Sequence, residues 1–238
     1  MPLTFGSLFA GIGGFDLGFE RAGMVCKWQV EKDDYARRVL EKHWPNVPRW
    51  DDVRTFCTGY ETWITGQGGV DVICAGFPCQ PVSNNGKKKA QNDERWLWPE
   101  VARIVRILRP QWVVLENVPG LLERGIGSVL GDLSAIGYDS EWDTIPAASF
   151  GAPHLRGRVF VVSYPTSQRS QRQKPKSRIW GRGLLAQCHR WTAEPALARL
   201  GNGIPERVAG TIACGNAVVP QVAEWIGERI IAASSPLP

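Results

Sequence analysis

Short apolar segments alternate with amphipathic segments along most of the chain, and this alternation restricts its fold more than any other feature. Four segments rich in β-branched and other apolar residues are predicted to be buried strands: 3–9, 25–31, 70–77 and 112–118. Three segments with apolar residues at helical spacing are predicted to be helices: 15–22, 33–44 and 97–110. Repeated strand–helix units favour an α/β fold with a doubly wound, mixed, mostly parallel sheet, whose ligands bind at the carboxyl ends of strands.

The C-terminal half continues this pattern with one interruption. Weaker strands are predicted at 138–147 and 158–164, and a final helix at 219–231. Between them, residues 165–191 are rich in Arg, Lys, Gln, Ser and Gly and hold few aliphatic residues, which indicates an insertion and not core. A chain of 238 residues with 43% hydrophobic and 21% charged residues is expected to form one globular domain.

The composition disfavours membrane proteins and metalloproteins. No apolar run approaches the ~18 residues of a membrane helix, and the first residues lack the basic start of a secretory signal. We therefore expect a cytoplasmic protein without a membrane partner. The six cysteines form no CxxC pair and no Cys/His cluster with zinc spacing, so no metal is expected.

A glycine-rich turn follows the first predicted strand, and an acidic residue closes the second. Gly11, Gly13 and Gly14 would let the backbone approach a ligand at a helix N-terminus. Glu31, about 20 residues further on, stands where a carboxylate can accept hydrogen bonds from the ribose hydroxyls of a nucleotide-like cofactor. Taken alone, the turn is equally compatible with a tight structural turn, and Glu31 with a surface carboxylate.

Cys79 lies between the end of a predicted strand and a polar loop, in the segment GFPCQPVS. Two flanking prolines stiffen its backbone, and the three lysines at 87–89 would favour a thiolate or contact phosphate. Glu116, at the end of the predicted strand 112–118, is expected at the same edge of the sheet, where a carboxyl can act as a general acid. The alternatives are a small buried apolar residue at Cys79 and a structural turn at Glu116 and Asn117.

Charge is distributed unevenly along the chain. The net charge is +5, and residues 144–193 contain nine Lys or Arg and no Asp or Glu. Such a basic block is typical of a surface that faces a phosphate backbone. It is equally typical of a solvated, partly disordered loop, and composition leaves these two interpretations even.

Five segments, taken in order, form a recognisable set. They are FGSLFAGIGGF, DVICAGFPCQPVS, WVVLENVPGLL, APHLRGRVFVVSY and GNAVVPQV. The set resembles the catalytic-domain motifs of the cytosine-5 DNA methyltransferases, over residues 3–164 and 201–231. The shortened C-terminal part is similar to that of phage and prophage members. The resemblance implies a Rossmann-like fold with a much reduced target-recognition region, S-adenosyl-L-methionine as cofactor, and a bacterial or phage-infected cell as the setting.

The resemblance implies a covalent mechanism on a cytosine that has been flipped out of the duplex. The thiolate of Cys79 would add to C6, which makes C5 able to accept a methyl group. Glu116 would act as the acid at N3. Arg158 would hold O2, with Arg156 beside it in the catalytic set.

The resemblance also implies the residues that bind the cofactor. They are Phe9, Gly11, Gly13, Glu31, Asp52, Val53, Pro78, Leu97, Asn216 and Val218. Phe9 would lie on one face of the adenine, Glu31 at the ribose hydroxyls, and Asp52 with Val53 at the adenine edge.

Two positions depart from the family pattern. Lys32 stands where the family often has an aromatic residue, which bears on the second face of the adenine. His154 stands where the family usually has Gln, either as a hydrogen-bonding substitute or as a structural residue. We expect activity to persist.

The resemblance divides the chain into three parts. Residues 1–164 would form the catalytic and cofactor-binding domain, 165–200 a short basic target-recognition insertion, and 201–238 a segment that completes the catalytic domain. The predicted DNA contacts, mostly to phosphate, are Ser83, Lys87, Lys88, Lys89, Arg169, Arg172, Lys174, Lys176, Arg178 and Arg182. The target sequence depends on which of these side chains reach which groove.

The main prediction is a DNA (cytosine-5)-methyltransferase that acts as a monomer on double-stranded DNA. A cognate restriction endonuclease is a candidate partner, in a restriction-modification pair. Two alternatives share the fold: a tRNA cytosine-5 methyltransferase, and a catalytically crippled DNA-binding regulator whose short reader cannot place cytosine in the site.

Overall fold

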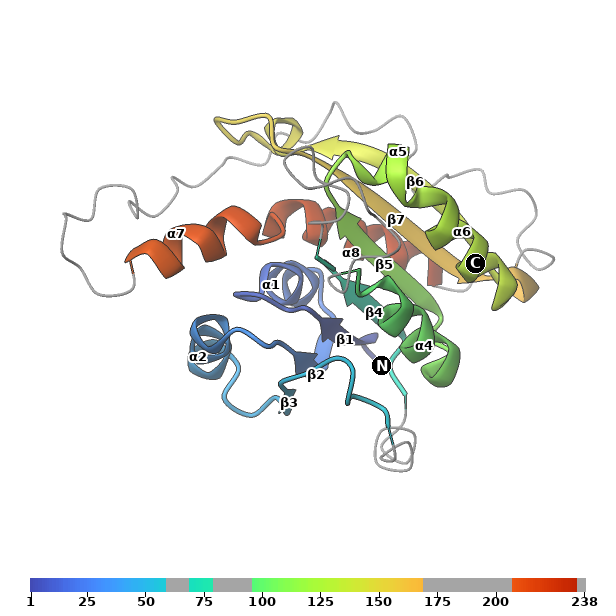
Figure 1. The fold of residues 1–238 in the computed structure, drawn as a ribbon, viewed down its shortest axis with the longest axis horizontal. Coiled ribbons are helices and arrows are strands. Elements are labelled where there is room, and N and C mark those ends of the chain that lie inside the picture. The colour runs from blue at the N-terminus through green and yellow to red at the C-terminus, as the bar shows by residue number, and fades with distance from the viewer. Residues whose placement is uncertain (59–68, 79–95, 169–206, 235–238) are drawn as a thin grey trace.

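The computed structural model describes residues 1–58, 69–78, 96–168 and 207–234, which form a sheet with helices on both faces (Figure 1). In chain order the elements are β1 (Thr4–Leu8), α1 (Gly14–Arg21), β2 (Val25–Val30), α2 (Asp34–His43), β3 (Arg49–Trp50), β4 (Val72–Ala75), α4 (Trp98–Leu108), β5 (Trp112–Asn117), α5 (Leu121–Arg124), α6 (Ile126–Ala135), β6 (Tyr138–Pro146), η1 (Ala147–Phe150), β7 (Gly157–Pro165), η2 (Thr166–Gln168), α7 (Arg207–Asn216) and α8 (Pro220–Ser234). Every strand and helix predicted above is present. The sequence patterns do not predict β3, α5, α6 or α7.

The seven described strands form one sheet in the order β3-β2-β1-β4-β5-β7-β6. Neighbours from β3 to β5 are parallel, whereas β7 runs antiparallel between β5 and β6. From β1 the chain moves outward to β2 and β3, and then crosses to β4 on the other side. The prediction of a doubly wound, mixed, mostly parallel sheet is therefore confirmed, and the strand order reverses between β1 and β4, where such sheets bind ligands.

Alternate residues of the central strands enter two separate apolar cores, one on each face of the sheet. Ile73 and Val113 belong to the core that α4 and α6 cover. Cys74 and Val114 belong to the core that α1 and α8 cover. Figure 1 shows α4 and α6 in front of the sheet and α8 behind it. Burial on both faces explains why these strands read as continuous apolar runs in the sequence.

The N-terminal and C-terminal ends of the described chain meet in the second core. Phe15 and Phe19 of α1 share this core with Val222 and Ile226 of α8, and the two helices pack against each other. The second core is thus completed by residues more than 200 positions away from α1. The division of the chain at 164 and 200 stays a prediction, because residues 169–206 lie outside the described part.

Candidate active site

Four parallel strands carry predicted site residues at their carboxyl ends. β1 leads into the turn at residues 9–14, β2 into Glu31, and β4 into residues 76–78. β5 ends with Glu116 and Asn117. Because these strands are parallel and form a continuous part of the sheet, the four ends share one edge.

The turn after β1 adopts a backbone conformation that its glycines permit. Gly11 and Gly13 have φ angles of 56° and 87°, in the left-handed region. Gly13 is also the N-cap of α1, so the helix begins directly from the turn. A Cβ atom on Gly14 would lie 2.2 Å from the backbone oxygen of Val218, so this close approach requires glycine. The result is a tight turn whose helix N-terminus favours an anionic ligand.

Phe9 precedes this turn in a backbone conformation that bulky residues rarely adopt. Its φ is 54°, and such conformations cluster at functional sites. The ring is partly buried against the core beneath α4, where Leu97 also packs and Val53 is buried. Three predicted cofactor residues from distant parts of the sequence therefore contact one apolar cluster.

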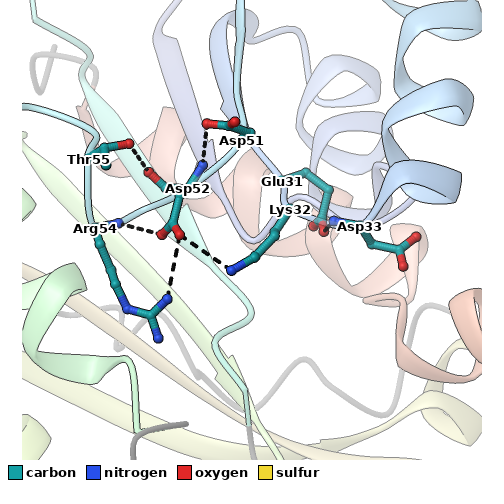
Figure 2. A network of polar contacts seen from close by, with 7 residues as sticks. All are labelled: Glu31, Lys32, Asp33, Asp51, Asp52, Arg54 and Thr55. Carbon is teal, nitrogen blue, oxygen red and sulfur yellow. Dashed lines mark hydrogen bonds and ion pairs between the residues drawn. The ribbon is translucent and has the colours of Figure 1, made fainter.

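Glu31 joins the turn after β1 to the start of α2. The backbone N–H of Gly11 donates to one oxygen of its carboxylate, and the N–H of Asp33 donates to the other, at 2.7 Å each. Figure 2 shows the Glu31 carboxylate beside the backbone of Asp33. Each carboxylate oxygen can accept a further hydrogen bond, so Glu31 keeps acceptor capacity for a ligand.

Asp52 lies at the centre of the polar network in Figure 2. Its carboxylate accepts from the backbone N–H of Arg54 at 2.9 Å and from the Lys32 ammonium at 3.4 Å. The pKa of Asp52 lies below its usual value, first because of the Arg54 N–H and then because of Lys32. Lys32, at the position where the family often has an aromatic residue, thus reaches across to Asp52. Its side chain is 75% exposed, so water and salt screen this ion pair.

Glu116 is a buried carboxyl beside a guanidinium group. It is 7% exposed, and its Oε1 lies 3.1 Å from Nε of Arg158. Burial raises the pKa of Glu116 to about 7, while the positive charges of Arg158 and Arg156 act in the opposite direction. A carboxyl with this pKa exchanges a proton near neutral pH, as a general acid requires.

Arg156 ties the loop before β7 to the segment that follows α7. Its Nη2 donates to the backbone oxygen of Ala217 at 2.7 Å, and its φ of 33° lies in the left-handed region. Arg156, Gly13 and Val218 line one cavity of about 240 Å³. A second, much smaller cavity joins Arg156 to Glu116 and Arg158. The structure therefore brings Arg156, Arg158 and Glu116 together.

Gly76 and Asn117, which the sequence patterns do not assign as site residues, lie where β4 and β5 end at the site. A Cβ on Gly76 would lie 3.3 Å from Oε2 of Glu116, so the absence of a side chain there leaves room for the carboxyl. The side-chain Nδ2 of Asn117 donates to the backbone oxygen of Phe77 at 3.1 Å. Pro78 follows Phe77 and precedes Cys79 in the sequence. The position of Asn117 next to Glu116 in the sequence was the one signal that could have assigned Asn117 to the site.

The structure places the remaining predicted cofactor residue, Asn216, at the exposed last position of α7. Predicted residues that lie outside the described part are Cys79, Ser83, Lys87, Lys88, Lys89, Arg169, Arg172, Lys174, Lys176, Arg178 and Arg182. Their roles stay predictions. Within the described part, no helix is both long and apolar enough to cross a membrane, and no group of three His, Cys, Asp or Glu could hold a metal ion.

Known proteins match most of this chain. Residues 3–183 match the family model for C-5 cytosine-specific DNA methylase. The Type II methyltransferase M.BsuFI of Bacillus subtilis is 37% identical over 169 residues, which are 69% of this chain and 40% of that protein. M.HhaI of Haemophilus parahaemolyticus is 34% identical over 167 residues, 68% of this chain and 49% of that protein. The matched region spans less than half of either relative.

Two solved structures share the fold of this chain. An E. coli protein, encoded within a prophage and provisionally assigned as a DNA modification methyltransferase, has a TM-score of 0.59 and 26% identity, over 70% of this chain and 48% of that one. The methyltransferase EhMeth of Entamoeba histolytica has a TM-score of 0.61 over 87% of this chain and 62% of that one; at 19% identity it supports the fold alone. The family model matches well over half of the residues of this chain, so this chain belongs to the C-5 cytosine-specific DNA methylase family.

Proposed function

We propose that this protein is a DNA (cytosine-5)-methyltransferase that uses S-adenosyl-L-methionine and the nucleophile Cys79. The observation that carries the proposal is the ion pair of the buried Glu116 with the partly buried Arg158, 3.1 Å apart, which abuts Gly76 three positions before Cys79. This pair would supply the acid that cytosine chemistry requires, next to the segment that would supply the nucleophile. The Type II methyltransferases among its relatives support the same reaction.

The residues present fit S-adenosyl-L-methionine. The N-terminus of α1 opens from the glycine turn, where a carboxylate such as that of the methionine moiety is stabilised. Both oxygens of Glu31 keep acceptor capacity for the two ribose hydroxyls. The residues that would complete the pocket are Phe9, Gly11, Gly13, Asp52, Val53, Pro78, Leu97, Asn216 and Val218. When bound, the cofactor supplies an electrophilic methyl group on its sulfonium sulfur.

The protein's own residues would make cytosine reactive. C5 of cytosine is a poor nucleophile, so the Cys79 thiolate forms a bond to C6. The electron pair of the C5–C6 double bond shifts to C4–C5, and that of the C4–N3 double bond shifts onto N3. Glu116 gives its proton to N3, which leaves an uncharged enamine with a nucleophilic C5. Once C5 carries the methyl group and the sulfonium of the cofactor has become a thioether, a base from solvent removes the proton on C5. N3 then returns its proton to Glu116, the C5–C6 double bond forms again, and the sulfur–C6 bond breaks to release the Cys79 thiolate.

The two arginines would serve different parts of this step. Arg158 holds the Glu116 carboxyl through Nε and would hold O2 of the cytosine through its remaining donors. Arg156 is bound to the Ala217 oxygen and would fix the segment between α7 and α8 against the site. Both positive charges also restrain the rise in the pKa of Glu116.

The proposed substrate is double-stranded DNA. C5 and C6 are inaccessible within a duplex, so the cytosine would be flipped out of the helix, with Ser83 and the lysines at 87–89 at the phosphates. The basic segment 165–200 would read a short or relaxed target site. The protein would act as a monomer, and a cognate endonuclease is its candidate partner.

The test is to express the chain in a host that lacks cytosine methylation and to map 5-methylcytosine across the genome. A C79A variant and an E116Q variant serve as controls. Methylation at a defined short motif, lost in C79A, is the expected result. Soluble protein that binds the cofactor and leaves the DNA unmethylated would contradict the proposal. Methyl transfer to tRNA in that case would favour the RNA alternative, and no transfer at all would favour the crippled regulator.

A further inference from the structure

Arg103 of α4 binds a segment about 50 residues away in the sequence. Its Nη2 donates to the backbone oxygen of Val53 at 3.0 Å and to that of Phe56 at 2.8 Å. Its Nε donates to the carboxylate of Glu100, one turn earlier on the same helix, at 2.8 Å. A single guanidinium therefore joins α4 to the turn at residues 52–56.

The turn at residues 52–56 lies outside the sheet. It follows the short strand β3, and its internal bonds run from the N–H groups of Thr55 and Phe56 to the oxygen of Asp52. The side chains of Val53 and Phe56 are buried at 4% and 1% exposure. Apolar contact fixes the depth of this turn, but non-directional packing does not orient its backbone. The two hydrogen bonds from Arg103 are directional contacts between α4 and this backbone.

The chemistry of arginine suits this role. The guanidinium is planar and carries five N–H donors in a fixed fork, so the bond from Nε to Glu100 also determines where Nη2 points. Lysine would offer one rotating ammonium at a single point. The side chain of Arg103 is only 28% exposed, so its bonds to the two carbonyl groups are partly shielded from water.

Both sides of the proposed adenine pocket meet at this contact. Asp52 and Val53 belong to the turn that Arg103 holds, and Leu97 is the N-cap of the helix that carries Arg103. We propose that Arg103 is a positioning residue for cofactor binding, which sets the adenine edge at Asp52 and Val53 against α4. This inference rests on the proposed function, because that function assigns these residues to the adenine.

The test compares R103M and R103K with the wild type. Arg106, exposed on the same helix, provides the matched control R106M. Calorimetry measures the Kd for S-adenosyl-L-methionine, steady-state assays separate its KM from kcat, and hydrogen exchange follows the amides of residues 52–56 in the cofactor-free protein. Thermal unfolding and DNA affinity are recorded for each variant.

In R103M we expect the cofactor Kd and KM to rise about tenfold, as loss of charge-assisted hydrogen bonds implies. The expected kcat at saturating cofactor and the DNA affinity are unchanged, while the amides of residues 52–56 exchange faster. R103K should recover part of the cofactor affinity, and R106M should match the wild type. R103K alone decides the question if R103M does not fold, since a twofold or larger rise in its Kd with normal unfolding supports the inference.

Two results would overturn the inference. One is wild-type cofactor affinity in folded R103M or R103K. The other is a fall in kcat, DNA affinity and Tm in proportion to the loss of cofactor affinity, which would indicate a general structural role. In either case a wild type that binds the cofactor leaves the proposed function standing. A wild type that binds no cofactor would remove the proposed function and this inference together.

Discussion

Glu116 is the residue whose ionisation bears most directly on the proposed chemistry. Burial raises its pKa to about 7, and the proposed step needs its protonated form. The protonated fraction falls as the pH rises through about 7. We therefore expect kcat/KM for DNA to fall on the alkaline side of that value. Glu116→Gln keeps a hydrogen-bond donor but cannot transfer a proton. We expect kcat to fall about a hundredfold to ten-thousandfold, measured by transfer of labelled methyl groups.

The shape of the pH profile separates this role from a structural one. In Glu116→Gln the decline above about pH 7 should disappear from the residual activity, because the titrating group is gone. Cofactor affinity serves as the control, since Glu116 is not assigned to the cofactor pocket. A variant with the wild-type profile and only a modest loss of rate would contradict the assignment of Glu116 as the acid.

Asp16 is a second buried carboxyl, in the first turn of α1, and it has no role in the proposed chemistry. Gln29 donates to it at 2.8 Å and Ser7 at 3.1 Å, so it links α1 to β1 and β2. Burial raises its pKa from 3.8 to about 6. The folded state therefore binds a proton that the unfolded state releases above 3.8. The stability that this proton contributes is fully present below pH 3.8 and is lost as the pH rises through about 6.

Asp16→Asn should remove this pH dependence, because Asn keeps an acceptor for Gln29 and stays uncharged. A pKa shift of two units corresponds to about 3 kcal/mol. We expect the wild type to lose about that much unfolding free energy relative to D16N between pH 4 and pH 7. Urea unfolding at several pH values measures the difference, with the exposed Asp34→Asn as a control for the loss of one carboxyl. Parallel curves for D16N and wild type would refute the account of Asp16.

At the level of elements, the junction between β4 and β5 makes the most specific prediction. Asn117→Asp keeps the side-chain oxygen that accepts from Val118 but removes the donor to the Phe77 oxygen. The segment after β4, which leads to Cys79, would lose this side-chain bond to β5, while the backbone pairing of the two strands stays. We expect a loss of about 1–3 kcal/mol in unfolding free energy and a fall in kcat with little change in cofactor affinity. An unchanged kcat in folded N117D would show that this bond does not position the nucleophile segment.

Element type was predictable where the apolar pattern was long, and less so elsewhere. The strands other than β3 follow from their apolar runs, and the helices α1, α2, α4 and α8 follow from the helical spacing of their apolar residues. α6 has two internal glycines, Gly127 and Gly131, which lower helix propensity, and it forms because Val129 and Leu133 pack on the sheet. β3 has two residues and exists only as a partner of β2, which no local pattern can reveal.

The same distinction applies to the candidate site of the whole molecule. Glu31 and Glu116 could be predicted because the fold class alone places strand ends at one edge. The bonds from Asn117 to Phe77 and from Arg103 to Val53 could not, since each joins residues 40 or 50 positions apart and depends on how the elements pack. The motif residues could thus be predicted from their order along the sequence. The residues that hold them in place could be identified only from the tertiary structure.

DNA binding by the whole molecule yields a separate prediction. Six basic residues of the segment 165–200 are proposed to face phosphate: Arg169, Arg172, Lys174, Lys176, Arg178 and Arg182. Each phosphate contact that is removed should lower the slope of log Kd against log salt by about 0.9. Replacing all six by Gln should weaken binding and flatten this slope, as fluorescence anisotropy would measure. An unchanged slope would place the DNA-facing surface elsewhere on the molecule.

One measurement tests directly whether Cys79 bonds covalently to cytosine during methyl transfer to DNA. Duplex DNA that contains 5-fluorocytosine carries fluorine where C5 normally loses its proton, so the sulfur–C6 bond cannot be released after methylation. Incubation with the protein and S-adenosyl-L-methionine, followed by protease digestion and mass spectrometry, identifies the attached residue. We expect a cofactor-dependent adduct on Cys79 that C79A lacks. Attachment at another residue, or methylation of ordinary DNA without any adduct on the fluorinated duplex, would contradict it.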